Sequence, residues 1–332
     1  MMARKLPIRL IRLGLTGAVR TQSVYHAVAR LAREDTPDTV ILTRPAEPYL
    51  CIGYHQAVDD VLDMDACRRR GLPVVRRDLG GGTTYLDSRQ LFYQFIFHHR
   101  RVPATPARIY RYFLLPALET LLGFGLPATL RDDNELEING RRVAGIGGGR
   151  IGESAVVVGN YLFDFDYAAL AELWQSPWPA YRTLAAGALN DRIATLWQSA
   201  PQLQLSSVEA ALADSLEQTL DRPVAPGVLT TEEERLADRL EGQLTGHDHL
   251  YRFTSLAGAP TPPLKIAAGL TIHAEQWQEA GAAWRGAFRV LDGVVEQALI
   301  ERREARAWQP VEHSLSGRPF DSWRDEREPV HA

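Results

Sequence analysis

Lysine is almost absent from this sequence, although basic residues are not. Only two of the 37 basic residues, Lys5 and Lys265, are lysines, and the others are arginines. We interpret this pattern mainly as drift from lysine to arginine in a genome with biased codon usage. A reaction that requires a lysine amine therefore has only two positions in this chain that could supply one.

Cysteines and long apolar runs are also scarce. Cys51 and Cys67 cannot build a disulfide framework, and neither has the spacing of a zinc site. Every apolar stretch is interrupted by arginine, proline or glycine well short of the roughly 20 residues that cross a bilayer. Residues 1–19 resemble a signal peptide superficially, but Arg9 and Arg12 interrupt the apolar part. These absences predict a soluble cytoplasmic protein that spans no membrane.

The remaining composition is that of an ordinary globular protein. Hydrophobic residues make up 45% of the 332 residues and charged residues 23%, which excludes wholesale disorder. The formal net charge is −4, so no generally basic surface for nucleic acid is expected. At roughly 150 residues per domain, the length predicts about two domains.

Hydrophobic periodicity predicts a mixed order of helices and strands. Helices are expected over residues 21–34, 58–70 and 106–122, the last kinked at Pro116. Strands are expected over residues 39–43, 49–53, 73–77, 91–97 and 155–163. The Asn139-Gly140 pair predicts a hairpin turn between strands at 135–138 and 141–146. Because strands and helices do not alternate strictly, the predicted fold class is α+β, with a mixed, largely antiparallel sheet flanked by helices.

A proline-containing stretch divides the chain. Residues 222–231 (RPVAPGVLTT) are interpreted as a linker, and a helix with three acidic residues in its first turn follows at Thr230 or Thr231. We therefore expect a large domain over residues 1–225, a small α+β domain over residues 226–313, and a polar tail over residues 314–332.

A glycine-rich segment, residues 76–87 (RRDLGGGTTYLD), is the most informative part of the sequence. Three consecutive glycines after a strand can turn their N–H groups toward an anion, and two arginines precede them. A plain glycine-rich turn with surface arginines explains this segment equally well when it is taken alone. It is neither a P-loop nor a GxGxxG motif.

A second segment, residues 134–147 (NELEINGRRVAGIG), changes that balance. Together the two segments resemble the lipoate–protein ligase family, which shares its catalytic fold with biotin ligases and octanoyl transferases. That family has R-R-x-x-G-G-G-x-x-x-H-D, followed downstream by N-D-[ILV] and G-[RK]-K-[IV]-x-G. Residues 53–56 (GYHQ) are similar to its G-x-x-Q, and residues 264–299 are similar to its small accessory domain.

The resemblance implies an enzyme that activates lipoate, or a related acyl acid, with ATP to an acyl-adenylate. The acyl group then passes to a lysine of a carrier, either a lipoyl domain or a glycine-cleavage carrier protein. The implied residues for binding the substrate and the adenylate are Arg77, Gly80, Gly81, Gly82, Thr84, Tyr85, Gln90, Asn134, Gly145 and Gly147. Glu135 is implied as a ligand of magnesium. The chain is expected to act as a monomer.

Three positions depart from the family pattern. Arg142 stands at the catalytic lysine, and Leu86 and Val158 stand where the family has histidines. An arginine keeps the charge of lysine, but it is larger and is not a conservative replacement at a close-packed site. The alternative is therefore a degenerate member that binds an acyl or adenylate ligand, or a lipoyl carrier protein, without turnover.

The octanoyl transferase branch offers a different mechanism. Thr84-Tyr85 and Gln90-Leu91 are similar to its motif, but that branch uses a cysteine nucleophile downstream of the lysine motif. No cysteine follows Cys67 here, so a cysteine mechanism is not expected. Two further histidine groups, at residues 98–99 and 247–249, are interpreted as surface features rather than metal ligands.

Overall fold

The computed structural model describes residues 6–132, 134–254, 262–267 and 269–323. The chain forms two compact units. The first unit comprises Met1–Gln56, Cys67–Asp166 and Ile193–Phe253, and the second comprises Ala57–Ala66, Tyr167–Arg192 and Thr254–Ala332. The expected boundary at residue 225 does not coincide with these units, because the segment that follows it packs into the core of the first unit.

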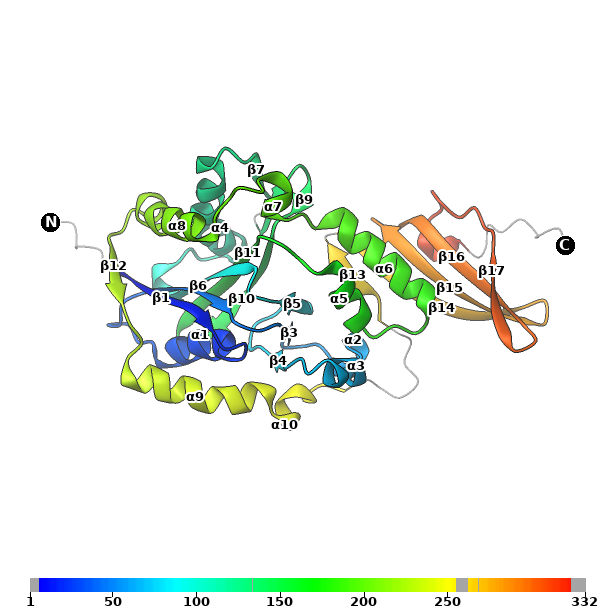
Figure 1. Ribbon diagram of the computed structural model, residues 1–332, viewed down its shortest axis with the longest axis horizontal. Coiled ribbons are helices and arrows are strands. Elements are labelled where there is room, and N and C mark those ends of the chain that lie inside the picture. Colours follow the sequence, from blue (N-terminus) through cyan, green and yellow to red (C-terminus); the bar gives the residue numbers. More distant parts are fainter. Residues whose placement is uncertain (1–5, 133, 255–261, 268, 324–332) are drawn as a thin grey trace. The chain divides into compact units, whose positions relative to one another are not determined.

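A six-stranded sheet forms the centre of the first unit (Figure 1). Its strands, in spatial order, are β10 (Ala144–Ile151), β11 (Ser154–Leu162), β6 (Gln90–His98), β2 (Thr39–Pro45), β1 (Ile8–Thr16) and β12 (Val224–Gly227). The first four pair antiparallel, and β1 pairs in parallel with both β2 and β12. The predicted α+β class with a mixed, largely antiparallel sheet is confirmed.

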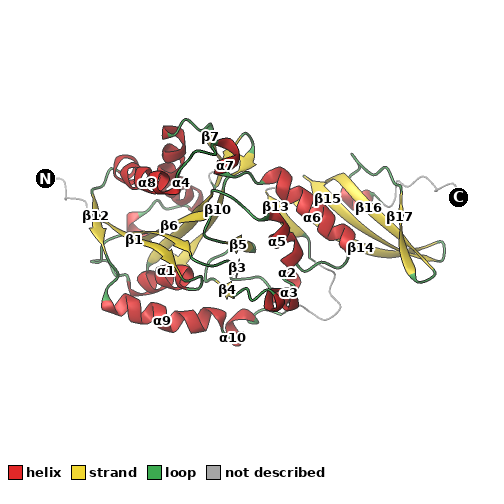
Figure 2. Ribbon diagram, in the orientation of Figure 1, coloured by secondary structure: helices red, strands yellow, loops and turns green. Residues whose placement is uncertain are grey.

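Helices cover both faces of this sheet, as Figures 1 and 2 show. One face packs against α4 (Pro106–Gly123) and α8 (Leu205–Leu220), and the other against α1 (Arg20–Leu31) and α9 (Thr231–Thr245). Every residue of β6 is buried, because alternate side chains enter one core or the other. The remaining helices of this unit are short: η1 (His99–Arg101), α7 (Leu196–Ser199) and α10 (His247–Leu250).

Two further sheets of three strands each contain or flank the two motif segments, residues 76–87 and 134–147. The first contains β4 (Val74–Arg76), β3 (Tyr49–Ile52) and β5 (Thr84–Leu86), and the glycine-rich segment joins β4 to β5. The second contains β7 (Ala128–Arg131), β8 (Glu135–Ile138) and β9 (Arg141–Arg142). Asn139 and Gly140 have φ values of 51° and 72°, as the predicted Asn-Gly hairpin turn requires.

The second unit is built on an antiparallel meander of five strands. These are β13 (Leu264–Ala267), β14 (Leu270–Glu279), β15 (Ala282–Leu291), β16 (Val294–Glu304) and β17 (Ala307–Val311). Its helical elements are α2 (Val58–Val61), α5 (Tyr167–Leu173), α6 (Pro179–Arg192) and η2 (Phe320–Ser322), while α3 (Met64–Arg69) crosses the boundary between the units.

Several local expectations differ from the structure. The helix expected over 58–70 is two short helices. The helix expected over 106–122 is α4, with Pro116 inside it. The expected linker contains β12, because four of its residues extend the edge of the central sheet beside β1. The expected polar tail packs as far as residue 323, since Leu315 and Trp323 are buried in the core of the second unit. Residues 324–332 lie outside the described residues.

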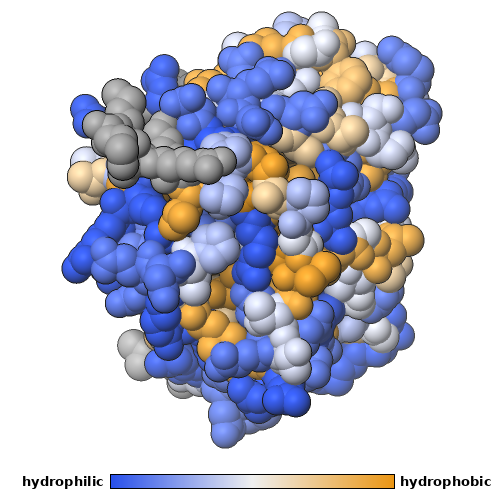
Figure 3. Space-filling view, turned by 90° about the vertical axis from the view of Figure 1, so that its left-hand side faces the viewer, coloured by the Kyte–Doolittle hydropathy of each residue, from blue (hydrophilic) through white to orange (hydrophobic). Residues whose placement is uncertain are grey.

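The surface gives no sign of a large apolar face on the side shown in Figure 3, where hydrophilic residues dominate and apolar ones lie between them. Among the described residues, Leu15 and Val228 are the most exposed large apolar side chains, at 57% and 79%. Within the described part of the chain, no helix is both long enough and apolar enough to cross a bilayer.

Candidate functional site

The glycine-rich segment forms a tight loop, which we call the glycine loop (residues 78–82). It follows β4 and lies against the end of β3, where the carbonyl of Gly81 packs so closely on Gly53 that no side chain would fit there. Gly81 has a φ of +105°, a conformation that side-chain-bearing residues rarely adopt. The glycines at positions 53 and 81 are therefore required by this turn itself.

Arg77 braces the glycine loop from within. Its Nε and Nη2 donate to the carbonyl of Gly80 at 3.2 and 2.9 Å, and Nη2 also donates to the carbonyl of Gly82 at 2.9 Å. The residue is only 7% exposed, and Nη1 lies 3.5 Å from the Cys51 thiol. The structure thus uses most of the donors of Arg77 on the protein's own backbone.

The brace leaves one side of the loop backbone open. With the carbonyls of Gly80 and Gly82 bound to Arg77, the N–H groups of Gly80, Gly81 and Gly82 have no acceptor among the described residues. Successive free N–H groups of this kind form a concave site for an anion. Gly81 and Gly82 are exposed, so a ligand can reach them.

Side chains from distant segments hold the base of the glycine loop at Asp78. The Asp78 N–H donates to Nε2 of His26 at 2.9 Å, and the Asp78 carboxylate accepts from Arg30 at 2.7 Å. His249 Nε2 lies 3.7 Å from that carboxylate. Although burial alone would raise it, the pKa of Asp78 is lowered by His26, Arg30 and His249.

His26 is entirely buried and is held as the neutral imidazole. Its Nδ1 lies 2.7 Å from the Gln22 carbonyl, so Nδ1 carries the proton and Nε2 accepts from Asp78. Burial lowers its pKa to about 4. Nothing in the sequence around His26 indicates this role, because its partner lies 52 residues away.

The glycines of β10 lie beside the loop. A side chain at Gly147 would contact the Gly80 carbonyl at 3.5 Å and Nε of Arg77 at 3.8 Å. Val158, which stands where the family has a histidine, is paired with Gly147 across the sheet. The structure therefore brings together the predicted residues Arg77, Gly80, Gly81, Gly82 and Gly147.

A second group of predicted residues surrounds Asn160, which sequence reasoning missed. The Asn160 side chain accepts from the Gly145 N–H at 2.9 Å and donates to Gln90 Oε1 at 2.5 Å. Gln90 in turn donates to the Tyr85 carbonyl at 3.1 Å. Tyr85 and Gln90 are buried, and Thr84, also on β5, is half-buried. These side chains connect β5, β6, β10 and β11 rather than facing solvent.

The third group lies on the sheet of β7, β8 and β9. Arg142 forms an ion pair with Glu135, and Arg131 binds the same carboxylate at 3.0 Å. Glu135 is 13% exposed and Arg142 24%. Arg131 also approaches Glu137 at 3.2 Å. The predicted catalytic cation and the predicted magnesium ligand are therefore bound to each other.

The remaining residues qualify the sequence interpretation. Asn134 is exposed, and its N–H donates to the Arg131 carbonyl at 3.1 Å. Both cysteines are buried, and burial raises the pKa of the Cys51 thiol. The part of the chain that the structure describes contains no group of three or more His, Cys, Asp or Glu side chains placed to hold a metal ion.

The central sheet with its two helical layers, and the glycine loop held by Arg77, define a protein of the lipoate ligase-like fold class. The model of the lipoyl protein ligase A/B catalytic domain matches residues 22–217, and the chain belongs to this family. The match includes the glycine loop and β10, but it ends before α9 and α10.

Individual relatives agree with this family. The octanoyltransferase LipM of Symbiobacterium thermophilum is 26% identical over 267 residues, which cover 73% of this chain and 96% of the relative. The lipoate–protein ligase of Streptococcus pyogenes is 26% identical over 180 residues, covering 52% of this chain and 50% of the relative.

Solved structures show the same fold. A bi-partite lipoate protein ligase from Thermoplasma acidophilum, studied with its E2 lipoyl domain, aligns with a TM-score of 0.68 at 20% identity and covers 76% of this chain and 99% of that one. Lipoate-protein ligase A bound with ATP aligns with a TM-score of 0.64 at 18% identity, covering 75% of this chain and all of that one.

Proposed function

We propose that this protein is a lipoate–protein ligase-type enzyme, which activates lipoate or a related acyl acid with ATP and transfers the acyl group to a lysine of a carrier domain. One observation carries the proposal: the glycine loop presents the N–H groups of Gly80, Gly81 and Gly82 while Arg77 holds its carbonyls away. Such a loop suits the phosphate or carbonyl oxygens of an activated acyl group.

The chemistry of adenylation needs donors of this kind. The carboxylate of the acyl acid attacks the α-phosphate of ATP, pyrophosphate leaves, and negative charge grows on the phosphate oxygens. Fixed N–H donors stabilise that charge without reorganising during the reaction. In this arrangement Arg77 is a positioning residue for the loop, whereas the resemblance implied direct contact with the ligand.

Transfer by a ligase is favoured over transfer through a covalent thioester. The relatives include octanoyltransferases, so the two reactions have to be weighed. A thioester mechanism needs an accessible thiolate, but Cys51 and Cys67 are each only 1% exposed. Burial also raises the pKa of the Cys51 thiol, which opposes thiolate formation.

Magnesium does not fit the implied ligand. A metal-binding carboxylate needs an oxygen free of cationic partners, and Glu135 is bound by Arg131 and Arg142. Glu135 is therefore not proposed as a metal ligand.

The same ion pair favours a second candidate function. If Glu135 neutralises Arg142, the charge at the family's lysine position is cancelled, and the protein binds an acyl or adenylate ligand, or a lipoyl carrier, without turnover. For either function we propose a cytoplasmic monomer whose carrier partner is a lipoyl domain or a glycine-cleavage carrier protein. The fold neighbour studied with its E2 lipoyl domain supports that class of partner.

Exchange between ATP and pyrophosphate tests the ligase proposal. We expect exchange that depends on lipoate, or on octanoate or biotin if the acyl acid differs. Binding of these acids without any exchange would contradict the ligase and support the binding protein. Transfer of an octanoyl group between carriers in the absence of ATP would instead support the transferase reaction of the relatives.

Two variants distinguish an Arg142 that serves catalysis from an Arg142 whose charge is cancelled by Glu135. In Glu135→Gln the carboxylate is neutral, so Arg142 is released while the size of the side chain is retained. If the ion pair between Glu135 and Arg142 prevents adenylation, Glu135→Gln should gain exchange between ATP and pyrophosphate. Glu137→Gln serves as the control, because it removes a carboxylate on the same strand whose ion pair is with Arg131, while the backbone pairing of residue 137 with Arg142 is retained.

A further inference from the structure

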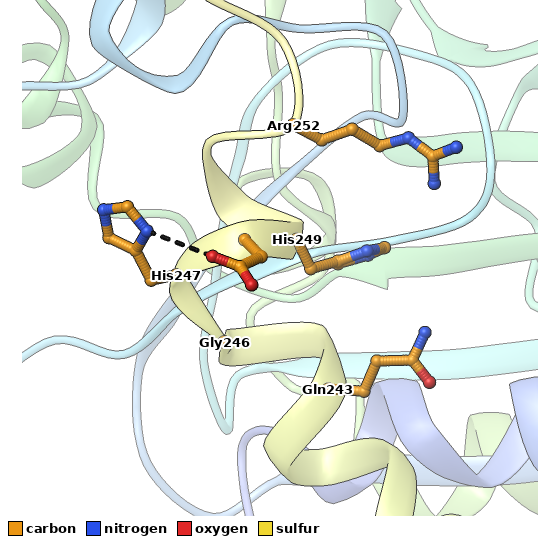
Figure 4. A pocket seen from close by; sticks show the side chains of 6 residues that line it. Gln243, Gly246, His247, His249 and Arg252 are labelled. Carbon is orange, nitrogen blue, oxygen red and sulfur yellow. Dashed lines mark ion pairs between the residues drawn. The ribbon is translucent and has the colours of Figure 1, made fainter.

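The short helix α10 packs against β4 in the first unit, outside residues 22–217 that match the family. Its two histidines have different environments. In Figure 4 the side chain of His249 projects away from that of His247. The His247 side chain is 81% exposed, whereas that of His249 is 10% exposed. The helix therefore presents one histidine to solvent and buries the other against its neighbours.

The buried histidine and the last residue of β4 bind each other reciprocally. Nε of Arg76 donates to the His249 carbonyl at 2.7 Å, and Nε2 of His249 lies 3.2 Å from the Arg76 carbonyl. Because a carbonyl oxygen can only accept, Nε2 of His249 carries the proton. Burial lowers the pKa of His249, which favours the neutral imidazole. Two hydrogen bonds thus fasten α10 to the end of β4.

The guanidinium of Arg76 also binds the segment that follows β3. Nη1 donates to the carbonyls of Gly53 and Tyr54 at 3.1 and 2.7 Å, and Nη2 donates to the Leu250 carbonyl at 2.5 Å. Arg76 is 0% exposed and contacts no carboxylate among the described residues. Backbone carbonyls, with the Phe253 ring 5.5 Å away, therefore hold this buried charge in place of an ion pair.

The segment that Arg76 holds is in direct contact with the glycine loop. The Tyr54 N–H donates to the Leu79 carbonyl at 2.9 Å, and the Gly81 carbonyl packs on Gly53. The guanidinium that binds α10 from one side thus also holds the residues on which the glycine loop rests.

The two arginines before the glycine loop therefore bind different parts of the protein. Arg77 donates to carbonyls within the loop, whereas Arg76 donates to carbonyls of α10 and of residues 53–54 behind it. We propose that Arg76 and His249 are positioning residues, which fasten α10 and residues 53–54 behind the glycine loop and so hold its N–H groups in place for the ligand. The identity of that ligand rests on the proposed function.

Amide hydrogen exchange tests the positioning without any ligand. The reporters are the Tyr54 N–H, bound to Leu79, and the Arg77 N–H, which donates to the Ile52 carbonyl at 3.1 Å. His249→Ala removes the bond to the Arg76 carbonyl, so both reporters should exchange at least about fivefold faster, while the amides of β6 in the central sheet keep their rates.

Two further histidine variants serve as rescue and control. His249→Gln places an amide nitrogen where Nε2 donates, so it should restore the exchange rates of wild type. His247→Ala is the matched control, because it removes the exposed histidine of the same helix. An equal acceleration of the reporters in His247→Ala would contradict the proposal.

The kinetics of ATP–pyrophosphate exchange give the functional readout. At a temperature where every variant is folded, His249→Ala should lower kcat/KM for lipoate at least about fivefold, and His249→Gln should stay within about twofold of wild type. A residue that only stabilised the fold would lower the unfolding temperature and leave kcat/KM of the folded protein unchanged. That result would overturn the proposal.

Arg76→Lys provides an independent perturbation. A single amine cannot reach the carbonyls of α10 and those of residues 53–54 together, so the same reporters should exchange faster. If this variant does not fold, His249→Ala decides alone. Absence of ATP–pyrophosphate exchange in wild type would contradict the ligase but not the positioning, which amide exchange measures independently. Unchanged exchange of the Tyr54 and Arg77 amides in a folded His249→Ala protein would overturn the positioning role.

Discussion

Acidification should destabilise this protein through His26, which the folded state holds in its neutral form. Nδ1 donates to the Gln22 carbonyl and Nε2 accepts from the Asp78 N–H, so a proton added to Nε2 would face another donor. Burial lowers the pKa of His26 to about 4. Because Asp78 begins the glycine loop, protonation of His26 would also release the base of that loop.

The magnitude follows from the two pKa values. The unfolded chain binds the proton near the ordinary value of about 6.5, and the folded chain only near 4. As the pH falls from about 6.5 to 4, the unfolded state binds more protons than the folded state, so the free energy of unfolding decreases. At 1.36 kcal/mol per pKa unit, the loss attributable to His26 reaches about 3 kcal/mol and does not grow below pH 4. Above pH 6.5 the residue causes no pH dependence.

Urea unfolding measured across this pH range checks the prediction. His26→Gln keeps an acceptor for the Asp78 N–H but does not titrate, so its stability should fall less steeply than that of wild type between pH 6.5 and 4. His247→Gln is the control, since His247 is 81% exposed. Parallel stability profiles for wild type and His26→Gln would refute the reasoning.

Three other substitutions test the site and the fold. Gly81→Val should abolish binding of the acyl-adenylate while the protein stays folded, because valine resists a φ of +105° and its Cβ would lie 2.7 Å from Arg77 Nη2; normal ligand affinity would mean that the loop is only a turn. If Arg142 serves catalysis, Arg142→Lys should reduce the exchange rate at least about tenfold, through loss of directed bonds that contribute about 1.5–3 kcal/mol each; exchange above the wild-type rate would identify the arginine as a lesion. Thr230→Ala removes the hydroxyl that accepts from the Glu233 N–H at 3.2 Å, and should lower the free energy of unfolding by about 1 kcal/mol, whereas Thr231→Ala, one residue into the helix, should change it much less.

Local features of this protein were readable from the sequence because neighbouring residues determine them. The Asn139-Gly140 turn follows from the ease with which these two residues adopt positive φ. The start of α9 follows from Thr230 and Glu233, which cap the helix reciprocally. The fold class was likewise predictable, because the order of helices and strands and the two glycine motifs are properties of the linear sequence.

The long-range contacts of the site were decided by the tertiary structure alone. His26 and His249 meet at Asp78 although they are 223 positions apart in the sequence. An arginine beside a glycine-rich segment is typical of a ligand-binding residue. The structure instead places Arg77 inside the loop, where its guanidinium donates to the carbonyls of Gly80 and Gly82. Arg142 was assigned from its motif, and only the structure shows that Glu135 binds it, although the cross-strand partner of Arg142 is Glu137.

The same distinction explains the errors at the domain boundary and at the C-terminal end. Residues 224–227 contain a proline and a glycine and are typical of a linker, yet they form β12 because the free edge of β1 offers hydrogen-bond partners for an extended segment. The polar composition around Trp323 predicts a tail, but that tryptophan is 2% exposed against the rings of Trp277 and Phe288. In both places the local sequence determines which conformations the segment can adopt. The surface that the rest of the chain presents decides which of these conformations is stable.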